Sequence, residues 1–227
     1  MKQILVTLFT LILSVSISSG QTINENENIL RIDNYLSELE KVGFYGSVLV
    51  ELNDEKAISK GYGFSDKESN SRNSPNTVFD IGSITKQFTA AAILKLEMQG
   101  KLSTEDQLSK YFDEIPADKA TITLHDLLRH QSGLISTIGK DYEQISKDDF
   151  LSQVLSSKLR FEAGSEFSYS NIGYSLLAMI IEQVSGQSYE TYLYENLWKP
   201  AKIQMTGYTR PKFDTNLIAT GYYRDDR

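Results

Sequence analysis

A serine and a lysine three residues apart, Ser83 and Lys86, are the residues of this chain best suited to chemistry. Residues three apart on an α-helix share a face, so the lysine amine can reach the serine hydroxyl. Serine is a weak nucleophile and needs such a neighbour. A lysine amine accepts a proton only where burial or nearby positive charge favours its neutral form. The pair therefore indicates a candidate acylated nucleophile with a proton partner.

The Ser-x-x-Lys pattern is short, and a chain with 26 serines and 16 lysines can contain it by chance. Its context is more specific. The apolar residues Phe79 and Ile81 and the flexible Gly82 precede Ser83, and an apolar helical pattern follows. This context predicts a helix that begins at the serine. The alternative is an N-cap serine beside an exposed lysine.

A second candidate pair, Tyr169 and Asn171, precedes another apolar helical pattern. A Tyr-x-Asn turn presents its phenol and its carboxamide in the same direction if the residue between them points away. A phenol whose pKa is lowered from about 10 by an ammonium group can exchange protons with a serine and a leaving group. The amide can hydrogen-bond a substrate carbonyl. A second copy of the pattern, at residues 194–196, falls inside an amphipathic run and is interpreted as ordinary helix.

Taken together, the two motifs resemble those of the serine β-lactamase and penicillin-binding-protein superfamily. The branch that they resemble contains class C β-lactamases, D-Ala-D-Ala carboxypeptidases and related esterases. Segments 127–134, 173–175 and 218–222 are similar to this branch as well. The resemblance covers roughly residues 46–222, and the ordered combination is specific where each single motif is not.

The resemblance implies a role for each motif residue. Ser83 would be the acylated nucleophile, Lys86 its proton partner, and Tyr169 the general base and acid. Asn171 would contact the substrate. The backbone N–H of Ser83 would supply one donor to the oxyanion that develops on the substrate carbonyl. No cofactor is expected.

One motif of the resembled superfamily does not occur in this chain: Lys-Thr-Gly, or its variant with histidine. In the resembled fold this third motif lies on an inner strand that also supplies a second oxyanion donor. We therefore expect the chain to be the amino-terminal part of a longer enzyme, with the remaining sheet strands after residue 227. The chain alone is expected to be inactive and, with an uncovered sheet edge, prone to aggregation.

Residues 1–20 have the composition of a cleavable secretory signal peptide. A lysine stands near the start, residues 4–17 are almost wholly apolar, and small residues precede Gln21. The apolar run is shorter than the roughly 20 residues that cross a bilayer comfortably. We therefore expect secretion or export to the periplasm. The alternative is an uncleaved membrane anchor.

Composition excludes several other classes of protein. The chain has no cysteine, so it has no disulfide, thiolate metal site or lipoprotein attachment site. Its net charge of −7 argues against a nucleic-acid partner. The two histidines, His125 and His130, lack the His-Glu-x-x-His arrangement, so no metal site is expected. Packing and capping are their expected roles.

The hydrophobic pattern predicts a helix, a β-hairpin and then mostly helices, which fits an α/β fold with an inserted all-α region. We expect residues 21–80 to form the helix and hairpin of the α/β region, and residues 81–227 to form a mainly helical region that carries both motifs. The expected elements are a helix from Glu25 that Gly43 closes, strands at 46–52 and 57–64 around a four-residue link, a loop at 65–76, and helices at 83–99, 104–111, 124–130, 147–156, 171–184 and 189–197.

Two functions of different class remain open. The first is an exported serine hydrolase that forms an acyl-enzyme from a β-lactam, a peptidoglycan stem peptide or a small ester, and acts as a monomer. The second is a non-catalytic protein that keeps the fold and binds a cell-wall fragment or peptide. Covalent labelling of Ser83 would discriminate between them. A third class, the α/β-hydrolases, needs a Gly-x-Ser-x-Gly elbow, which the sequence lacks.

Overall fold

The computed structural model describes residues 25–53, 55–140, 143–208 and 214–222. The chain divides into two units. Unit 1 comprises residues 1–77 and 219–227, and unit 2 comprises residues 78–218. The expected signal peptide lies outside the described residues.

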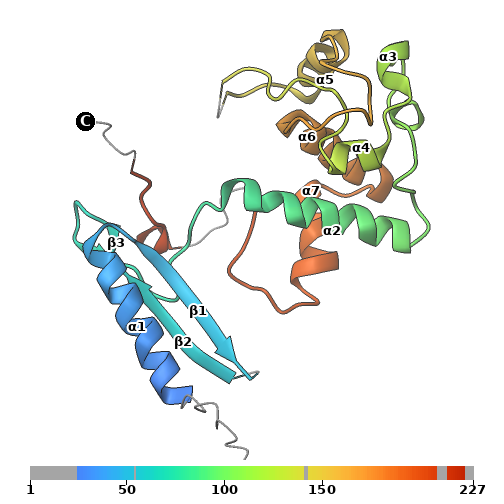
Figure 1. Ribbon diagram of the computed structural model, residues 1–227. Helices are drawn as coiled ribbons and strands as arrows, with labels where there is room; N and C mark the ends of the chain where they lie inside the picture. The colour runs from blue at the N-terminus through green and yellow to red at the C-terminus, as the bar shows by residue number, and fades with distance from the viewer. Residues whose placement is uncertain (1–24, 54, 141–142, 209–213, 223–227) are drawn as a thin grey trace, which may run out of the picture. The chain divides into compact units, whose positions relative to one another are not determined.

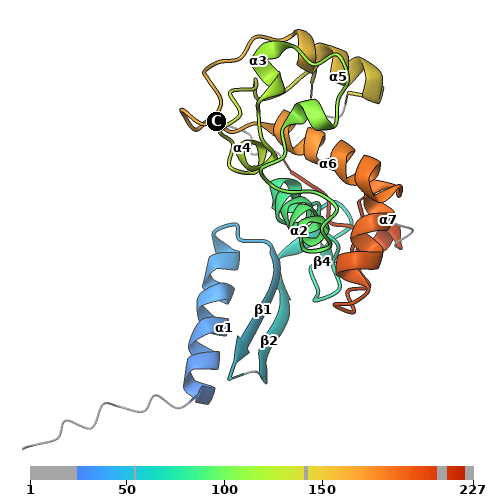
Figure 2. The same ribbon diagram turned by 90° about the vertical axis from the view of Figure 1, so that its right-hand side faces the viewer.

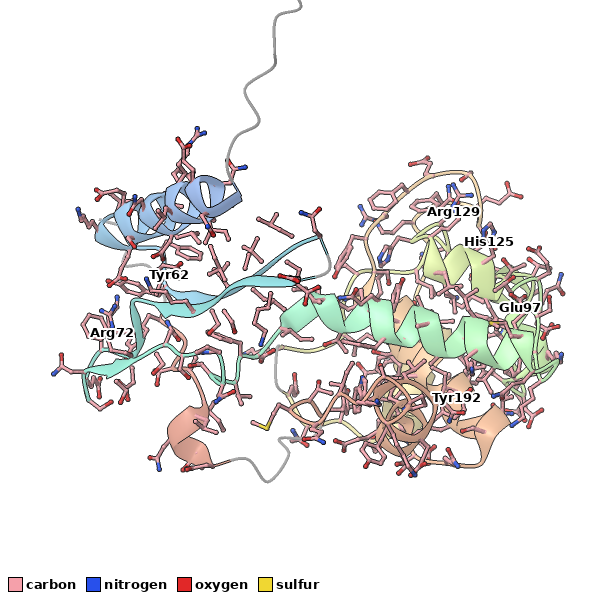
Figure 3. All side chains as sticks on the ribbon, turned by 90° about the horizontal axis from the view of Figure 1, so that it is seen from below. Tyr62, Arg72, Glu97, His125, Arg129 and Tyr192 are labelled. Carbon is pink, nitrogen blue, oxygen red and sulfur yellow. The ribbon has the colours of Figure 1, made fainter. Side chains whose placement is uncertain are left out.

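Unit 1 contains helix α1 (Glu25–Lys41) and an antiparallel hairpin of β1 (Gly46–Leu52) and β2 (Glu55–Tyr62), as Figure 1 shows. The helix ends as predicted, with Gly43 at a φ of +102° that favours glycine. Asp33 of α1 accepts hydrogen bonds from Tyr62 Oη and Lys60 Nζ, both at 2.7 Å. Tyr62 is almost fully buried and is labelled beneath α1 in Figure 3.

The hairpin is confirmed, but its predicted four-residue link is wrong. The second strand begins at Glu55, which pairs with Leu52, so the connection is residues 53–54. Asn53 has a φ of +51°, a conformation that asparagine tolerates and that two-residue hairpin turns require. Glu55 and Lys56 extend the strand beyond its predicted start, and because both are polar the apolar pattern did not reveal them.

The predicted loop at 65–76 also contains a second, shorter hairpin. It pairs β3 (Phe64–Asp66) with β4 (Ser71–Arg72). Both residues of β4 are exposed, so they show no apolar alternation that sequence analysis could detect. Further along the chain, Thr220 N–H donates to Ser65 O at 2.8 Å and the Tyr222 hydroxyl lies 3.0 Å from Asp66 Oδ1, which ties the end of the unit to this hairpin.

Unit 2 is built around three helices that pack on one another: α2 (Thr85–Met98), α6 (Asn171–Ser185) and α7 (Tyr189–Leu193) (Figures 1 and 2). A π-helical segment, Tyr194–Trp198, continues α7. Their inward-facing side chains are apolar and follow the helical period. The fully buried members are Ala92, Ile93, Leu96, Ile172, Leu176, Leu177, Ile180, Ile181 and Leu193. This core fixes the beginnings of α2 and α6, which carry both motifs.

The shorter elements of unit 2 agree with the sequence in part. Helix α5 (Lys147–Ser156) has the predicted bounds, and α4 (Leu124–Leu128) lies within its predicted range. Ser188 caps α7, because its side chain accepts the Thr191 N–H. Helix α3 (Ala117–Ala120) was not predicted, and neither was the 3-10 turn Thr215–Leu217.

The predicted helix at 104–111 is wrong except for a 3-10 turn, Leu108–Lys110. Asp106 is the physical reason. Its carboxylate accepts the Ser103 N–H at 2.8 Å and the Tyr111 hydroxyl at 2.6 Å, and such local bonds compete with helix formation. The Leu108 N–H instead donates to Ile122 O at 2.8 Å, so the segment pairs with a distant part of the chain.

The ends of unit 2 lie side by side, because the Val78 N–H donates to Leu217 O at 2.8 Å.

Among the described helices, none has the length and apolar character needed to cross a membrane.

Gly133 is a position where the fold requires glycine. Its φ is +72°, and a Cβ atom there would lie 2.1 Å from Phe161 O. Gly133→Ala is therefore expected to destabilise the protein by about 1–3 kcal/mol more than Gly100→Ala. Gly100 is a matched control, since its φ is +67° and its added Cβ would have no neighbour within 4 Å. Denaturant unfolding of both variants measures the difference, and equal losses would contradict the prediction.

Candidate active site

Ser83 lies in a one-turn 3-10 helix, Gly82–Ile84, immediately before α2. The expected start of the α-helix at the serine is thus wrong by two residues. Gly82 has a φ of +49°, and its N–H is held by Asp80 Oδ1 at 2.8 Å. This Asp-x-Gly turn leads the chain into the 3-10 helix, in which the serine is exposed. Ser83 caps neither helix with its side chain, so the N-cap alternative does not describe this structure.

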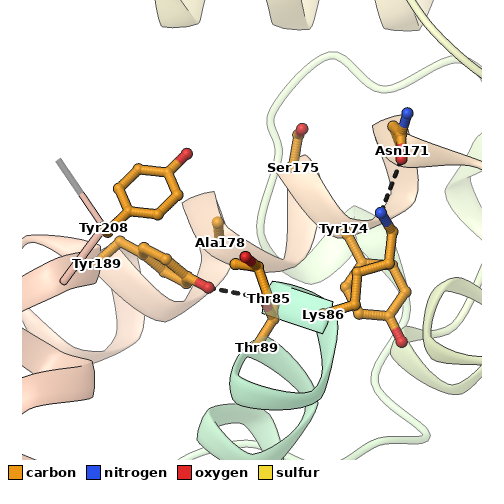
Figure 4. Close-up of a pocket in the computed structure, with 9 residues that line it drawn as sticks. All are labelled: Thr85, Lys86, Thr89, Asn171, Tyr174, Ser175, Ala178, Tyr189 and Tyr208. Atoms are coloured by element: carbon orange, nitrogen blue, oxygen red, sulfur yellow. Dashed lines mark hydrogen bonds between the residues drawn. The ribbon is translucent and has the colours of Figure 1, made fainter. Parts of the chain in front are cut away.

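Lys86 lies in the first turn of α2 and is half-buried. Its Nζ donates to Ser83 Oγ at 3.3 Å and to Asn171 Oδ1 at 2.8 Å. The same Nζ stands 4.8 Å from the centroid of the Tyr169 ring. The lysine therefore contacts the serine and both residues of the second motif. Figure 4 shows its bond to Asn171 at the start of α6.

Tyr169 and Asn171 approach Lys86 because the residue between them points away. Ser170 is buried, donates to Ile135 O at 2.8 Å and accepts the Gly173 N–H as the N-cap of α6. With Ser170 turned inward, the Tyr169 hydroxyl reaches Ser83 Oγ at 2.6 Å. Four side chains from two elements far apart in sequence thus meet at one place within unit 2.

The electrostatics of this cluster favour proton exchange. Burial raises the pKa of Tyr169, but the interaction with Lys86, the hydrogen bond with Ser83 and the positive charge of Lys86 together lower that pKa below its ordinary value of 10. The phenol and the serine hydroxyl are within direct hydrogen-bond distance. A proton can therefore pass between them without an intervening water.

His130 is a neighbour of the cluster to which the sequence analysis assigned no part in the chemistry. Packing and capping were its expected roles. The imidazole does pack, but against Tyr169, with 4.5 Å between the ring centroids. Its position in segment 127–134, one of the segments that resemble the superfamily, was the available signal.

The second Tyr-x-Asn copy makes local contacts. Tyr194 and Asn196 lie in the π-helical segment, and Asn196 Nδ2 donates to Tyr192 O at 3.0 Å. Glu195 between them pairs with Lys199 at 2.7 Å. These are the contacts of a helix surface, as interpreted from the sequence.

A cavity of about 210 Å³ adjoins the cluster and is walled by α2, α6 and the start of α7 (Figure 4). Lys86 and Asn171 stand at one end of it. Tyr189 lines the other end, where its hydroxyl bonds Thr89 at 2.7 Å and its ring meets Tyr208 at 5.0 Å. The full lining is Thr85, Lys86, Thr89, Asn171, Tyr174, Ser175, Ala178, Tyr189 and Tyr208. The cavity offers an apolar and aromatic wall beside the polar cluster.

The part of the chain that the structure describes contains no group of three or more histidine, cysteine, aspartate or glutamate side chains placed to hold a metal ion.

Comparison with known proteins identifies the family. The model of the family named Beta-lactamase matches residues 32–227, so the chain belongs to that family. It is 35% identical over 202 residues to PbpX of Bacillus subtilis (strain 168), whose name marks it as a candidate penicillin-binding protein. This match covers 89% of the chain and 49% of PbpX.

Solved structures show the same fold. FmtA from Staphylococcus aureus matches with a TM-score of 0.78 and 30% identity, over 90% of this chain and 56% of FmtA. A class C β-lactamase in complex with cefoxitin matches with a TM-score of 0.80 and 25% identity, over 90% of this chain and 58% of the enzyme. The chain has the α/β fold of β-lactamases and penicillin-binding proteins, and it spans about half the length of the relatives that it matches.

Proposed function

We propose that the protein is an exported serine hydrolase that forms a covalent acyl-enzyme at Ser83. The observation that carries this proposal is the convergence of four side chains, with Ser83 Oγ 2.6 Å from the Tyr169 hydroxyl and 3.3 Å from Lys86 Nζ. Asn171 completes the cluster through its bond to Lys86. Membership of a family that includes serine hydrolases supports the same reading.

The proposed reaction begins with proton transfer. Tyr169 as phenolate takes the proton of Ser83 as Oγ attacks the substrate carbonyl carbon, and the carbonyl oxygen becomes an oxyanion. The backbone N–H of Ser83 donates to that oxyanion. When the tetrahedral intermediate collapses, the bond to the leaving group breaks and the Tyr169 hydroxyl returns its proton to that group. An ester of Ser83 remains, and water hydrolyses it in a second cycle of the same proton transfers.

Lys86 and Asn171 have distinct parts in this proposal. The ammonium group of Lys86 favours the phenolate form of Tyr169, because the charge of the phenolate is stabilised by a cation nearby. Asn171 Oδ1 holds Lys86 in place at 2.8 Å and leaves the amide nitrogen free to meet a substrate carbonyl. The aromatic wall of the adjacent cavity would bind the apolar part of a substrate.

The substrate class is a β-lactam, a D-Ala-D-Ala peptide of the cell wall or a small ester. All three contain a carbonyl carbon that a serine can attack, and they differ in the leaving group. The proposal includes export, from the composition of residues 1–20, and action as a monomer. The class C β-lactamase solved with cefoxitin supports a β-lactam as the first compound to test.

Covalent labelling tests the proposed function. The complete product of the gene is incubated with a penicillin or an activated acyl ester and analysed by intact-mass spectrometry and peptide mapping. We expect one added acyl group, on the peptide that contains Ser83, and no label on heat-denatured protein. A label on another serine would refute the assignment of the nucleophile. No label from either probe would favour the non-catalytic binding protein.

A further inference from the structure

His130 occupies an unusual backbone position two residues after the end of α4. Its φ is +57°, in the left-handed region that few side chains adopt. Its carbonyl oxygen accepts the Ser168 N–H at 2.9 Å, which ties it to the segment leading into Tyr169. In this conformation the imidazole faces the second motif.

The imidazole contacts the second motif in two ways. Nδ1 accepts the backbone N–H of Ser170 at 3.1 Å. The ring packs on Tyr169 at 4.5 Å with an interplanar angle of 34°, and on Tyr174 of α6 at 5.1 Å. Because Ser170 stands between Tyr169 and Asn171, one hydrogen bond and one ring contact hold the phenol and the carboxamide together.

We propose that His130 is a positioning residue whose neutral imidazole holds Tyr169 against Ser83 and releases it when the ring gains a proton. This inference rests on the proposed function, in which Tyr169 is the general base. His130 itself contacts no reacting atom in the proposed mechanism. It acts through the backbone of Ser170 and through the Tyr169 ring.

The physical basis of this release is that Nδ1 of His130 changes from a hydrogen-bond acceptor to a donor when it gains a proton. Nδ1 can accept the Ser170 N–H only while it carries no proton, which places the proton of the neutral ring on Nε2. Protonation of Nδ1 sets two donors against each other, and the Ser170 N–H is left without its acceptor. A displacement of Ser170 moves both Tyr169 and Asn171 away from Lys86 and Ser83.

The surroundings of His130 favour, on balance, the neutral form of its imidazole. Burial lowers its pKa below 6.5, and the positive charge of Lys86 on α2 lowers it further, while the bond with Ser170 opposes them. Tyr169 and Tyr174 are the titratable groups that pack directly on the ring. The Arg160 guanidinium donates to Ser168 Oγ at 2.8 Å, and the Ser168 N–H in turn donates to His130 O. The ring therefore stays neutral to a lower pH than an ordinary histidine does.

Nuclear magnetic resonance tests the contact without any substrate. ¹⁵N-labelling of histidine in the complete gene product gives one imidazole for each histidine, and the signal that disappears in His130→Asn is that of His130. We expect His130 to titrate below pH 6.5 and the Ser170 amide resonance to shift with the same midpoint. A Ser170 amide that does not respond to this titration would overturn the inference.

Two variants separate the hydrogen bond from the backbone strain. Asparagine and glycine both tolerate a positive φ, so His130→Asn and His130→Gly suit the backbone. Asparagine places an oxygen near the position of Nδ1 and cannot gain a proton, while glycine supplies no acceptor. We expect acylation of Ser83 at pH 8 to be about ten- to hundredfold slower in His130→Gly than in His130→Asn, with similar binding of the probe before acylation.

The pH profile supplies a readout that a merely structural role would not change. In the native protein, the acylation rate should fall more steeply with acid below the His130 midpoint, because Tyr169 and His130 both gain protons. His130→Asn should lack this additional steepening. Identical profiles, or a native rate that rises as His130 becomes charged, would overturn the inference. If Ser83 is not acylated at all, the proposed function fails. The response of the Ser170 amide resonance to the titration of His130 still decides whether the imidazole holds Ser170.

Discussion

Ser83→Ala is expected to abolish covalent labelling and to reduce hydrolysis by about a thousandfold or more. Oγ is the only atom that the substitution removes, and the proposed reaction has no other nucleophile. Ser83 is exposed and caps no helix, so the fold should be unchanged. Hydrolysis of a chromogenic cephalosporin, a short nitrophenyl ester and a D-Ala-D-Ala peptide by the complete gene product measures the effect.

Ser156→Ala is a suitable control for this experiment. Ser156 is also an exposed serine in a helical turn, at the end of α5, where its hydroxyl donates to Gln153 O at 3.2 Å. The control should retain activity and labelling. Activity that survives in Ser83→Ala would show that another group or a bound water attacks the substrate, and the acyl-enzyme proposal would be wrong.

The helices and strands whose apolar residues recur at a regular spacing could be predicted from the sequence. Helix α1, the hairpin, α5 and the beginning of α6 follow from apolar periodicity and from residues such as Gly43 that stop a helix. The approach of Ser83 and Lys86 follows from helical spacing, since a 3-10 turn leading into an α-helix keeps residues three apart on one side. The meeting of this pair with Tyr169 and Asn171 depends on tertiary packing. It was anticipated only through the family resemblance.

Features that depend on single side-chain contacts could not be predicted. Asp106 bonds to Ser103 and Tyr111 and prevents the helix that local propensity favours. The two-residue hairpin turn needs the left-handed Asn53, and polar composition alone allowed a longer link. His130 was interpreted as a packing or capping residue, and no local pattern reveals its contact with Ser170, which is 40 residues away in the chain.

Tyr169 and Ser83, the proposed base and nucleophile, share a short hydrogen bond, and Lys86 contacts both. In this arrangement the loss of the phenol oxygen cannot be compensated by a movement of the ring, because His130 and the N-cap residue Ser170 fix its position. The hydroxyl of Tyr169 is therefore the second group of this cluster whose removal should have a large effect.

Tyr169→Phe is expected to slow acylation of Ser83 and turnover by about a hundredfold or more, with the fold intact. The substitution keeps the ring and its contact with His130 but removes the proton acceptor. Because the neighbouring Lys86 and Ser83 lower the pKa of Tyr169, the phenolate fraction in the native protein rises with pH and is complete below the pH that an ordinary phenol requires. The native rate should follow that rise, and the variant should not.

Tyr194→Phe is the matched control for Tyr169→Phe. Tyr194 belongs to the second Tyr-x-Asn copy, is 47% exposed against 42% for Tyr169, and also has a lysine near its ring, with Lys199 Nζ 6.0 Å from the centroid. The two substitutions therefore remove the same atom from similar surroundings, and they differ in the contact with Ser83. Stopped-flow acylation of both variants across the pH range gives the comparison. Near-native rates in Tyr169→Phe would assign the proton acceptor to Lys86, whose Nζ is the other group within hydrogen-bond distance of Ser83 Oγ among the described residues.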